Sequence, residues 1–173
     1  MKRKKIITNK DEIFNTFFNL MKYYIENNYT NLLQTLVTYL DFSCLNKDGE
    51  YIMVYAAEFN YVESLSILLK SKLDCNIENI DGFTPIMKAC ENGHEKCVSM
   101  LIKAGANCKL YDPYGYTLMS LASECGHYEC LKVLIDAKED CNKPDFAKIT
   151  PLSLAIKKGH TNCIELLIDA GAI

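Results

Sequence analysis

Apolar residues recur along this chain with the spacing of short helices. In residues 81–110, apolar side chains fall on one face of a helix that starts at Pro85, and a second apolar stripe follows Gly93. Thr84 can cap the first helix, and glycine can end it in a left-handed conformation. The pattern predicts two helices of about ten residues joined by a tight turn. The stripes comprise Ile86, Ala89 and Cys90, and then Cys97, Val98, Leu101 and Ile102.

This helix pair is copied along the chain at an interval of 33 residues. Three pentapeptides, GHEKC, GHYEC and GHTNC, begin at residues 93, 126 and 159 and contain all three histidines. Helices of this length are not stable alone in water, so each pair must be stabilised by packing on its neighbours. A solenoid is therefore predicted. Other series in the same phase are Thr84, Thr117 and Thr150; Ala56, Ala89, Ala122 and Ala155; and Leu68, Leu101, Leu134 and Leu167.

The units resemble ankyrin repeats over residues 46–173. The resemblance implies an all-α solenoid of helix-turn-helix units joined by β-hairpin-like loops. We expect about four regular repeats and one divergent N-terminal repeat. The matching motifs are Thr84-Pro85, Thr150-Pro151, Ala56-Ala57, the three Gly-His pairs, Leu68-Leu69, Gly105-Ala106, Asp74-Cys75-Asn76 and Asp140-Cys141-Asn142.

The chain is expected to form one ankyrin-repeat domain over residues 11–173, preceded by a basic tail at residues 1–10. Residues 11–45 are expected to form a divergent capping repeat, in which Tyr23 and Tyr24 replace the alanine pair while Leu32 and Leu36 keep the 33-residue register. Lys138 replaces a helix-ending glycine, so the fourth unit is expected to fray most easily. The regular repeats are expected at 46–78, 79–111, 112–144 and 145–173.

Composition narrows the function classes. The chain has 49% apolar residues and 24% charged residues, with a formal net charge of -3, which argues against a nucleic-acid-binding surface. No stretch is apolar enough to cross a membrane or to act as a signal peptide, so the nine cysteines are expected to be free thiols in the cytoplasm. The run from Lys2 to Lys5 is either a nuclear import signal or a solvated end.

The Gly-His-x-x-Cys motif invites a metal or catalytic interpretation, and both are weak. Each copy supplies two ligands, whereas structural zinc requires four that converge on one point. Catalytic groups have no reason to repeat with the fold, and no other catalytic motif is present. We therefore expect no metal, no cofactor and no enzymatic activity, and we interpret Cys97, Cys130 and Cys163 as core residues.

The resemblance implies that hairpin tips and first helices form a concave face that binds a protein partner. The expected tips lie at residues 47–50, 80–83, 113–116 and 146–149, and the stretch YDPYGY (111–116) crowds three tyrosines at one of them. Large apolar and aromatic side chains in such a place are typical of binding hot spots, although some rings could fold back onto their own loops. The candidate apolar patch comprises Ile80, Phe83, Tyr111, Tyr114, Tyr116, Phe146 and Ile149.

Beside this patch, Glu58, Glu91 and Glu124 are expected to form an acidic strip that would suit a partner with Lys or Arg, unless they are only solvated glutamates.

The sequence thus favours a non-enzymatic protein-binding module. The alternative is an assembly protein that forms homo-oligomers through its C-terminal repeat, whose last helix lacks a clearly polar outer face. Asn76 and Asn142 also lie in stretches that are similar to sites of asparaginyl hydroxylases in ankyrin hairpins.

Overall fold

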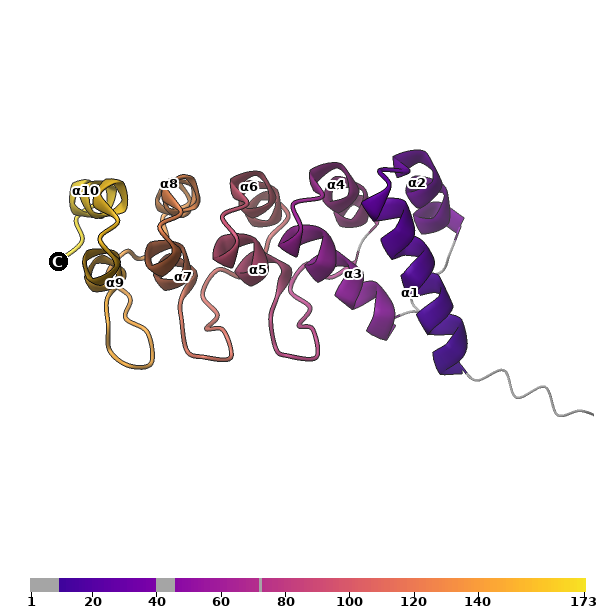
Figure 1. The fold of residues 1–173 in the computed structure, drawn as a ribbon, viewed down its shortest axis with the longest axis horizontal. Helices are drawn as coiled ribbons and strands as arrows, with labels where there is room; N and C mark the ends of the chain where they lie inside the picture. The colour runs from indigo at the N-terminus through magenta and orange to yellow at the C-terminus, as the bar shows by residue number, and fades with distance from the viewer. Residues whose placement is uncertain (1–9, 40–45, 72) are drawn as a thin grey trace, which may run out of the picture.

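The computed structural model describes residues 10–39, 46–71 and 73–173, which contain ten helices and no strand. The helices alternate between two rows, and successive pairs stack along one axis (Figure 1). This arrangement confirms the predicted all-α solenoid. We number the pairs as units 1 to 5: α1 Lys10–Glu26 and α2 Thr30–Tyr39; α3 Asn46–Glu58 and α4 Val62–Lys70; α5 Pro85–Glu91 and α6 Glu95–Lys103; α7 Leu118–Cys125 and α8 Tyr128–Asp136; α9 Pro151–Lys158 and α10 Thr161–Asp169.

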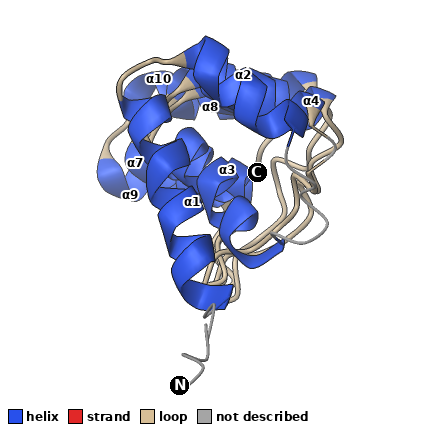
Figure 2. Ribbon diagram, turned by 90° about the vertical axis from the view of Figure 1, so that its right-hand side faces the viewer, coloured by secondary structure: helices blue, strands red, loops and turns tan. Residues whose placement is uncertain are grey.

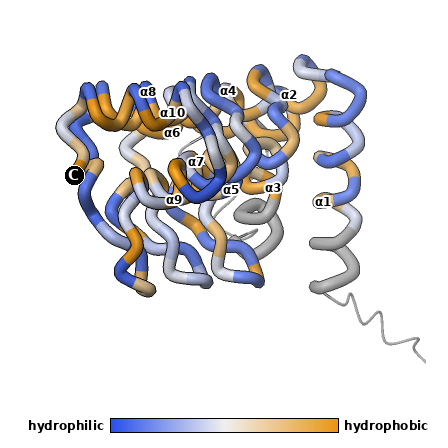
Figure 3. Tube along the Cα trace, turned by 60° about the vertical axis from the view of Figure 1, so that its left-hand side comes forward, coloured by the Kyte–Doolittle hydropathy of each residue, from blue (hydrophilic) through white to orange (hydrophobic). Residues whose placement is uncertain are grey.

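The stack has two distinct edges. On one, short turns join the two helices of each unit; on the other, long hairpin loops join successive units and lie side by side when the stack is viewed along its axis (Figure 2). We call these the turn edge and the hairpin edge. The helices carry most of the hydrophobic residues along the trace (Figure 3). None of the helices in the described ranges is long and apolar enough to span a membrane.

Capping residues begin and end the helices largely as the sequence predicts. The Thr117 and Thr150 hydroxyls accept hydrogen bonds from the backbone N–H groups three residues later, at 3.0 and 3.3 Å. Thr84 differs, because Met87 stands where the later units have serine. The backbone N–H of Thr84 donates to the Met87 sulfur at 3.4 Å, and the buried Thr84 hydroxyl has no partner. Lys138 takes the left-handed conformation of the glycine that it replaces, with φ of 66°.

The turn edge is built from histidines that join neighbouring units. The Nε2 atoms of His94, His127 and His160 lie 2.9, 2.9 and 3.0 Å from the backbone carbonyls of Glu58, Glu91 and Glu124 in the preceding unit. Because a carbonyl can only accept, Nε2 must carry the proton. These histidines therefore supply hydrogen bonds between neighbouring units.

A glycine of the preceding unit makes room for each of the last two histidines. Gly93 and Gly126 are left-handed, and a Cβ added to them would lie 2.5 and 2.6 Å from Nδ1 of His127 and His160. Such a contact is too short for any side chain to occupy. At Gly93 and Gly126, the glycine of one Gly-His pair thus leaves space for the histidine ring of the next, which the sequence pattern alone did not indicate. We call this space a seat.

The cysteine three residues after each of these histidines lies in the core. Cys97, Cys130 and Cys163 are buried, which confirms the prediction that they act as small apolar residues. Burial, with the nearby carboxylates as a smaller cause, raises the pKa of Cys97 to about 11 and that of Cys130 to about 12. Neither thiol is therefore ionised at neutral pH.

Unit 1 is one residue out of the predicted register. Its left-handed turn residue is Asn28, with φ of 54°, which corresponds to Asn60 with φ of 59° at a spacing of 32 residues. Tyr29 therefore takes the place of the turn histidines. Tyr24 and Ile25, and not Tyr23 and Tyr24, stand where the alanine pair belongs, since Tyr29 N–H bonds to Tyr24 O as Tyr61 N–H bonds to Ala56 O.

The hairpin edge has three tips in the described chain, at residues 79–83, 112–116 and 145–149. The expected tip at 47–50 lies within α3, which begins at Asn46, and its side chains are outside the described residues. The expected basic tail and the end of the capping repeat, residues 1–9 and 40–45, also lie outside the described ranges.

Candidate functional site

Each hairpin tip is organised by one short polar side chain. The Oδ1 atoms of Asn79, Asp112 and Asp145 accept a backbone N–H four residues later at 2.8 Å each. The backbone N–H of the same three residues donates to the carbonyl four residues later, at 2.9, 2.9 and 3.0 Å. These bonds close a tight loop and fix the direction of the residues at its end.

Successive tips are stacked on one another. The Pro113 ring lies over Gly82, 3.0 Å from where a Cβ would stand, and the Phe146 ring lies over Gly115 at 2.6 Å. Phe146 N–H also donates to Gly115 O at 3.0 Å. The three tips therefore form one continuous surface, in which the residue that covers each glycine differs from tip to tip.

Three large apolar side chains on this surface are exposed. Ile80 is 84% exposed, Tyr114 75% and Phe146 68%. Each comes from a different tip, and the exposed Pro113 lies beside Tyr114. We call Ile80, Pro113, Tyr114 and Phe146 the tip patch. An apolar surface of this kind, held on rigid turns, is typical of a contact site.

The other aromatic and apolar candidates do not contribute equally. Phe83 was expected on the exposed patch, but it is only 6% exposed, because Tyr114 packs on its ring at 5.9 Å and the Lys88 ammonium lies 4.1 Å from its centre. Tyr111 lies behind Phe146, with ring centres 4.5 Å apart, and is half-buried. Tyr116 and Ile149 are also half-buried. These four residues support the patch more than they extend it.

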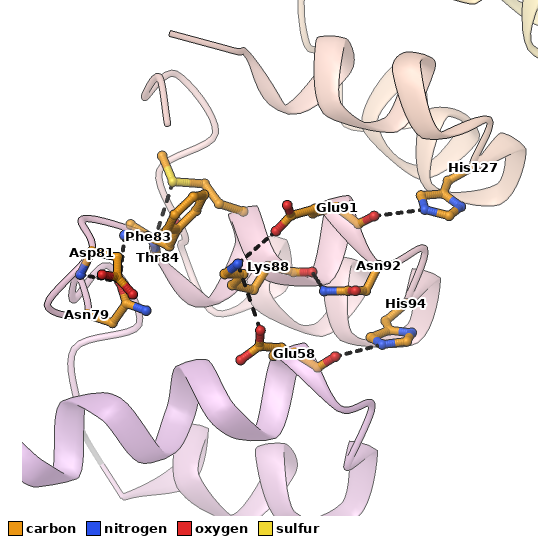
Figure 4. Close-up of polar contacts among 11 residues, drawn as sticks. Glu58, Asn79, Asp81, Phe83, Thr84, Lys88, Glu91, Asn92, His94 and His127 are labelled. Atoms are coloured by element: carbon orange, nitrogen blue, oxygen red, sulfur yellow. Dashed lines mark hydrogen bonds and ion pairs between the residues drawn. The ribbon is translucent and has the colours of Figure 1, made fainter. Parts of the chain in front are cut away.

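The predicted acidic strip is interrupted by lysines. The Lys88 ammonium lies 2.9 Å from Glu91 and 3.8 Å from Glu58, and therefore joins units 2 and 3 (Figure 4). Partial burial opposes the charge on Lys88, but the bonds and charges of these carboxylates outweigh it and raise its pKa. Glu124 pairs with Lys158 of the next unit at 3.1 Å. The three glutamates lie as predicted at the ends of first helices, but each has a cation beside it.

Tyr116 connects the second tip, at residues 112–116, to this row of charges. Burial and a hydrogen bond to the Glu124 carboxylate raise the pKa of the Tyr116 hydroxyl above its ordinary value. The hydroxyl is therefore neutral at physiological pH and serves as a donor to Glu124. Tyr116 thus acts as a link between the hairpin edge and α7 and does not act as a free contact residue.

Among the described residues of the hairpin edge, Asp112 has a buried carboxylate oxygen without a hydrogen-bond partner. Its Oδ1 accepts the N–H groups of Tyr114 and Tyr116 at 2.9 and 2.8 Å, whereas its Oδ2 is buried without a partner. Burial raises the pKa of the carboxyl, although the backbone N–H groups work in the opposite direction. The following tip uses an aspartate that has no such orphaned oxygen.

Metal-binding and nucleophilic chemistry find little support at these residues. Within residues 10–39, 46–71 and 73–173, no group of three or more His, Cys, Asp or Glu side chains is placed to hold a metal ion. The histidines bond to backbone carbonyls, and burial keeps the neighbouring thiols protonated. The two candidate hydroxylation sites link adjacent loops: Asn76 Oδ1 accepts Asn107 N–H at 2.6 Å, and Asn142 Oδ1 accepts Ile173 N–H at 2.9 Å.

Comparison with known proteins agrees with this architecture. A family model of three ankyrin repeats matches residues 54–145, and a model of a single ankyrin repeat matches residues 148–173. A search of curated proteins finds no match. The two matched ranges cover units 3 to 5 and most of unit 2.

Proposed function

Because the chain belongs to the ankyrin repeat family, whose repeats are generally non-enzymatic protein-interaction modules, we propose that it binds a protein partner through the tip patch. The observation that carries the proposal is the exposure of Ile80, Tyr114 and Phe146 on three stacked tips. Isolated exposed apolar residues are common on any protein, but a row of them on a fixed backbone is not.

The structure of the tips supports binding without a large rearrangement. Each tip is closed by hydrogen bonds around Asn79, Asp112 or Asp145, and each later tip rests on the one before. A partner would therefore meet side chains whose backbone is already ordered, which reduces the entropy lost on binding. Tyr114 adds a hydroxyl at the end of an apolar ring, a combination enriched at hot spots.

The partner should present an apolar segment to the tips. The paired glutamates weaken the prediction of a strongly basic partner, because Lys88 and Lys158 already neutralise much of that strip. Charge on the partner is therefore expected to influence the rate and salt dependence of binding more than its strength. A cytoplasmic or nuclear location remains part of this proposal.

The test is quantitative affinity capture with a triple variant, Ile80→Ala, Tyr114→Ala and Phe146→Ala. Proteins captured by the wild type through the tip patch should bind the variant at least about tenfold more weakly, since one hot-spot residue alone is worth about 2 kcal/mol. The matched control is Phe59→Ala, an exposed ring on the turn edge. If captured proteins survive the triple change but are lost with Phe59→Ala, the tip patch is not the binding surface.

A further inference from the structure

The two end faces of the stack expose positions that every internal junction buries. At the C-terminal face, Ile156 is 57% exposed, whereas the equivalent Ala57, Cys90 and Ser123 of units 2 to 4 are fully buried by the unit that follows. Ile168 on α10 is exposed on the same face, whereas its equivalents on α6 and α8 are half-buried. Unit 5 therefore presents an apolar face of the kind that its predecessors use for stacking.

The N-terminal face shows the matching feature. Leu32 is 49% exposed, whereas the equivalent positions of the later units, which face the preceding unit, are buried. Tyr29, at the position of the turn histidines, is also exposed. The buried equivalents of Leu32 are Ser64, Cys97, Cys130 and Cys163.

The turn edge of unit 5 holds a vacant seat. At Gly93 and Gly126 the seat is filled by the ring of the following histidine, but around Gly159 nothing lies within 4 Å of where a Cβ would stand. In unit 1 the ring at the corresponding place is that of Tyr29. If unit 1 of another copy packs on unit 5, the Tyr29 ring would lie at Gly159, as the histidine rings lie at Gly93 and Gly126.

The hairpin edge restricts which helix pair can stack on unit 5. In units 3 and 4 the next tip packs over a glycine, Gly82 or Gly115. In unit 5 the equivalent residue is Lys148, which has a side chain and φ of 63°. A further tip cannot stack there in the same way. Unit 1 has no tip, because α1 is helical from Lys10 through the region where the later units form one. Its helix pair suits an end that accepts helices but not a hairpin.

Charge also favours a junction between these two faces. In units 1 to 4 a glutamate lies in the last turn of the first helix, whereas unit 5 has Lys157 at this position; the glutamates are Glu26, Glu58, Glu91 and Glu124. Stacking unit 1 on unit 5 would place Lys157 beside Glu26, opposite charges at neighbouring positions. Inside the stack, Glu58 and Glu91 are like charges with Lys88 between them. Glu26 already accepts a hydrogen bond from Tyr55 and lies 3.9 Å from Lys22, so Lys157 would add a cation to this group.

From these observations we propose that a second copy of this chain binds head to tail, with its unit 1 seated on unit 5 of the first copy. This self-association uses both ends of the stack and is independent of the tip patch. The interface is heterologous, so each copy keeps one free face of each kind after pairing. The mass should therefore rise with concentration beyond the dimer if the geometry does not close.

The test measures solution mass by analytical ultracentrifugation from about 10 to several hundred micromolar, a range chosen for interfaces of modest affinity. The variants are Leu32→Glu, which blocks only the N-terminal face, and Ile156→Glu, which blocks only the C-terminal face. Both positions are about half exposed, so circular dichroism should show an unchanged fold. Each variant alone should remain at the monomer mass of 19.7 kDa, with the apparent Kd raised at least about tenfold.

Mixing the two variants is the decisive arm. Their unblocked faces are complementary, so the equimolar mixture should form dimers and nothing larger. If Leu32→Glu still dimerises alone while Ile156→Glu does not, the C-terminal faces pair with each other and the head-to-tail proposal is wrong. A wild type that stays monomeric at every concentration also overturns it. Ile80→Glu is the control at the tip patch; it should leave self-association unchanged, so failure of either proposal does not decide the other.

Discussion

The turn edge and the hairpin edge share one packing feature, which has a different role on each edge. On both, a ring from one unit lies over a left-handed glycine of the unit before, as His127 does over Gly93 and Phe146 over Gly115. On the turn edge that ring is always histidine from unit 3 onward, and its nitrogen bonds to a backbone carbonyl. On the hairpin edge the ring changes from Pro113 to Phe146 and stays exposed.

The difference separates stacking from recognition. A residue that must satisfy a backbone carbonyl in each unit has one chemical task, so the same residue type serves every time. A residue that only covers a glycine can vary, provided that it fits, and its outer surface is then available for a partner. This division predicts larger losses of stability from substitutions on the turn edge than from substitutions on the hairpin edge.

The largest effect is expected at a filled turn-edge seat. Gly126→Ala should lower the free energy of unfolding by about 3 kcal/mol, because the new Cβ would overlap the His160 ring in addition to the strain of a left-handed alanine. Gly159→Ala is the matched control, with the same backbone conformation and nothing nearby, and should cost about 1 kcal/mol. Urea unfolding followed by circular dichroism measures both. Equal losses would mean that the histidine seat is not tight.

A turn-edge histidine is expected to contribute less to stability than the glycine at a filled turn-edge seat. His127→Ala removes the hydrogen bond to Glu91 O and leaves that carbonyl without its partner, which should cost about 2 kcal/mol. The comparison is Phe146→Ala on the hairpin edge, where the exposed ring makes no side-chain hydrogen bond and the loss should be below about 1 kcal/mol. A larger loss for Phe146→Ala in urea unfolding would contradict the division of roles.

A third measurement asks whether the hairpin seat is as rigid as the turn seat. Gly115→Ala should cost about 1.5 kcal/mol, less than Gly126→Ala, because the Phe146 ring is exposed and can move aside. Combining Gly115→Ala with Phe146→Ala should recover part of that loss, since the overlap disappears while the backbone strain remains. A strictly additive double variant would show that the two residues do not interact.

The smallest effect is expected from the charge of Asp112 inside the second tip, where removal of the charge should stabilise the protein. The raised pKa of Asp112 means that the folded state favours the protonated carboxyl, so the stability it contributes is present below the unfolded pKa and is lost as pH rises through the folded pKa. Asp112→Asn should therefore stabilise the protein at pH 7, by about 1 kcal/mol. The gain should shrink as the pH falls through the raised pKa of Asp112 and vanish below the unfolded pKa, where the carboxyl is neutral in both folded and unfolded states. Asn79, which organises the previous tip, shows that the amide fits.

The periodic part of the fold could be predicted from the sequence because it depends on local signals. Thr150, Pro151 and Gly159 begin and end α9 as their capping preferences indicate. The slip in unit 1 could not be found from the 33-residue series, since Leu32 is a plausible member of it. The better signal was the pair Asn28-Tyr29, which matches Asn60-Tyr61 at a spacing of 32 residues.

The candidate site was predictable only in outline. The sequence locates Ile80, Tyr114 and Phe146 at tips, but it does not give the direction of each side chain. Phe83 is buried because the next tip brings Tyr114 over it, a contact between residues 31 positions apart. Likewise, the strip of glutamates is readable from the period, whereas the lysines that cross it come from positions that do not repeat.

The seat at Gly126 has a consequence for how such a gene can change. Each histidine bonds only to the unit before it, so a stack that lost unit 5 would end at Gly126 with the same kind of vacant seat that Gly159 has now. Loss or duplication of one unit's coding segment would preserve every remaining junction on the turn edge. Stack length can therefore drift by whole units, while each hairpin tip acquires its own residues through separate point mutations.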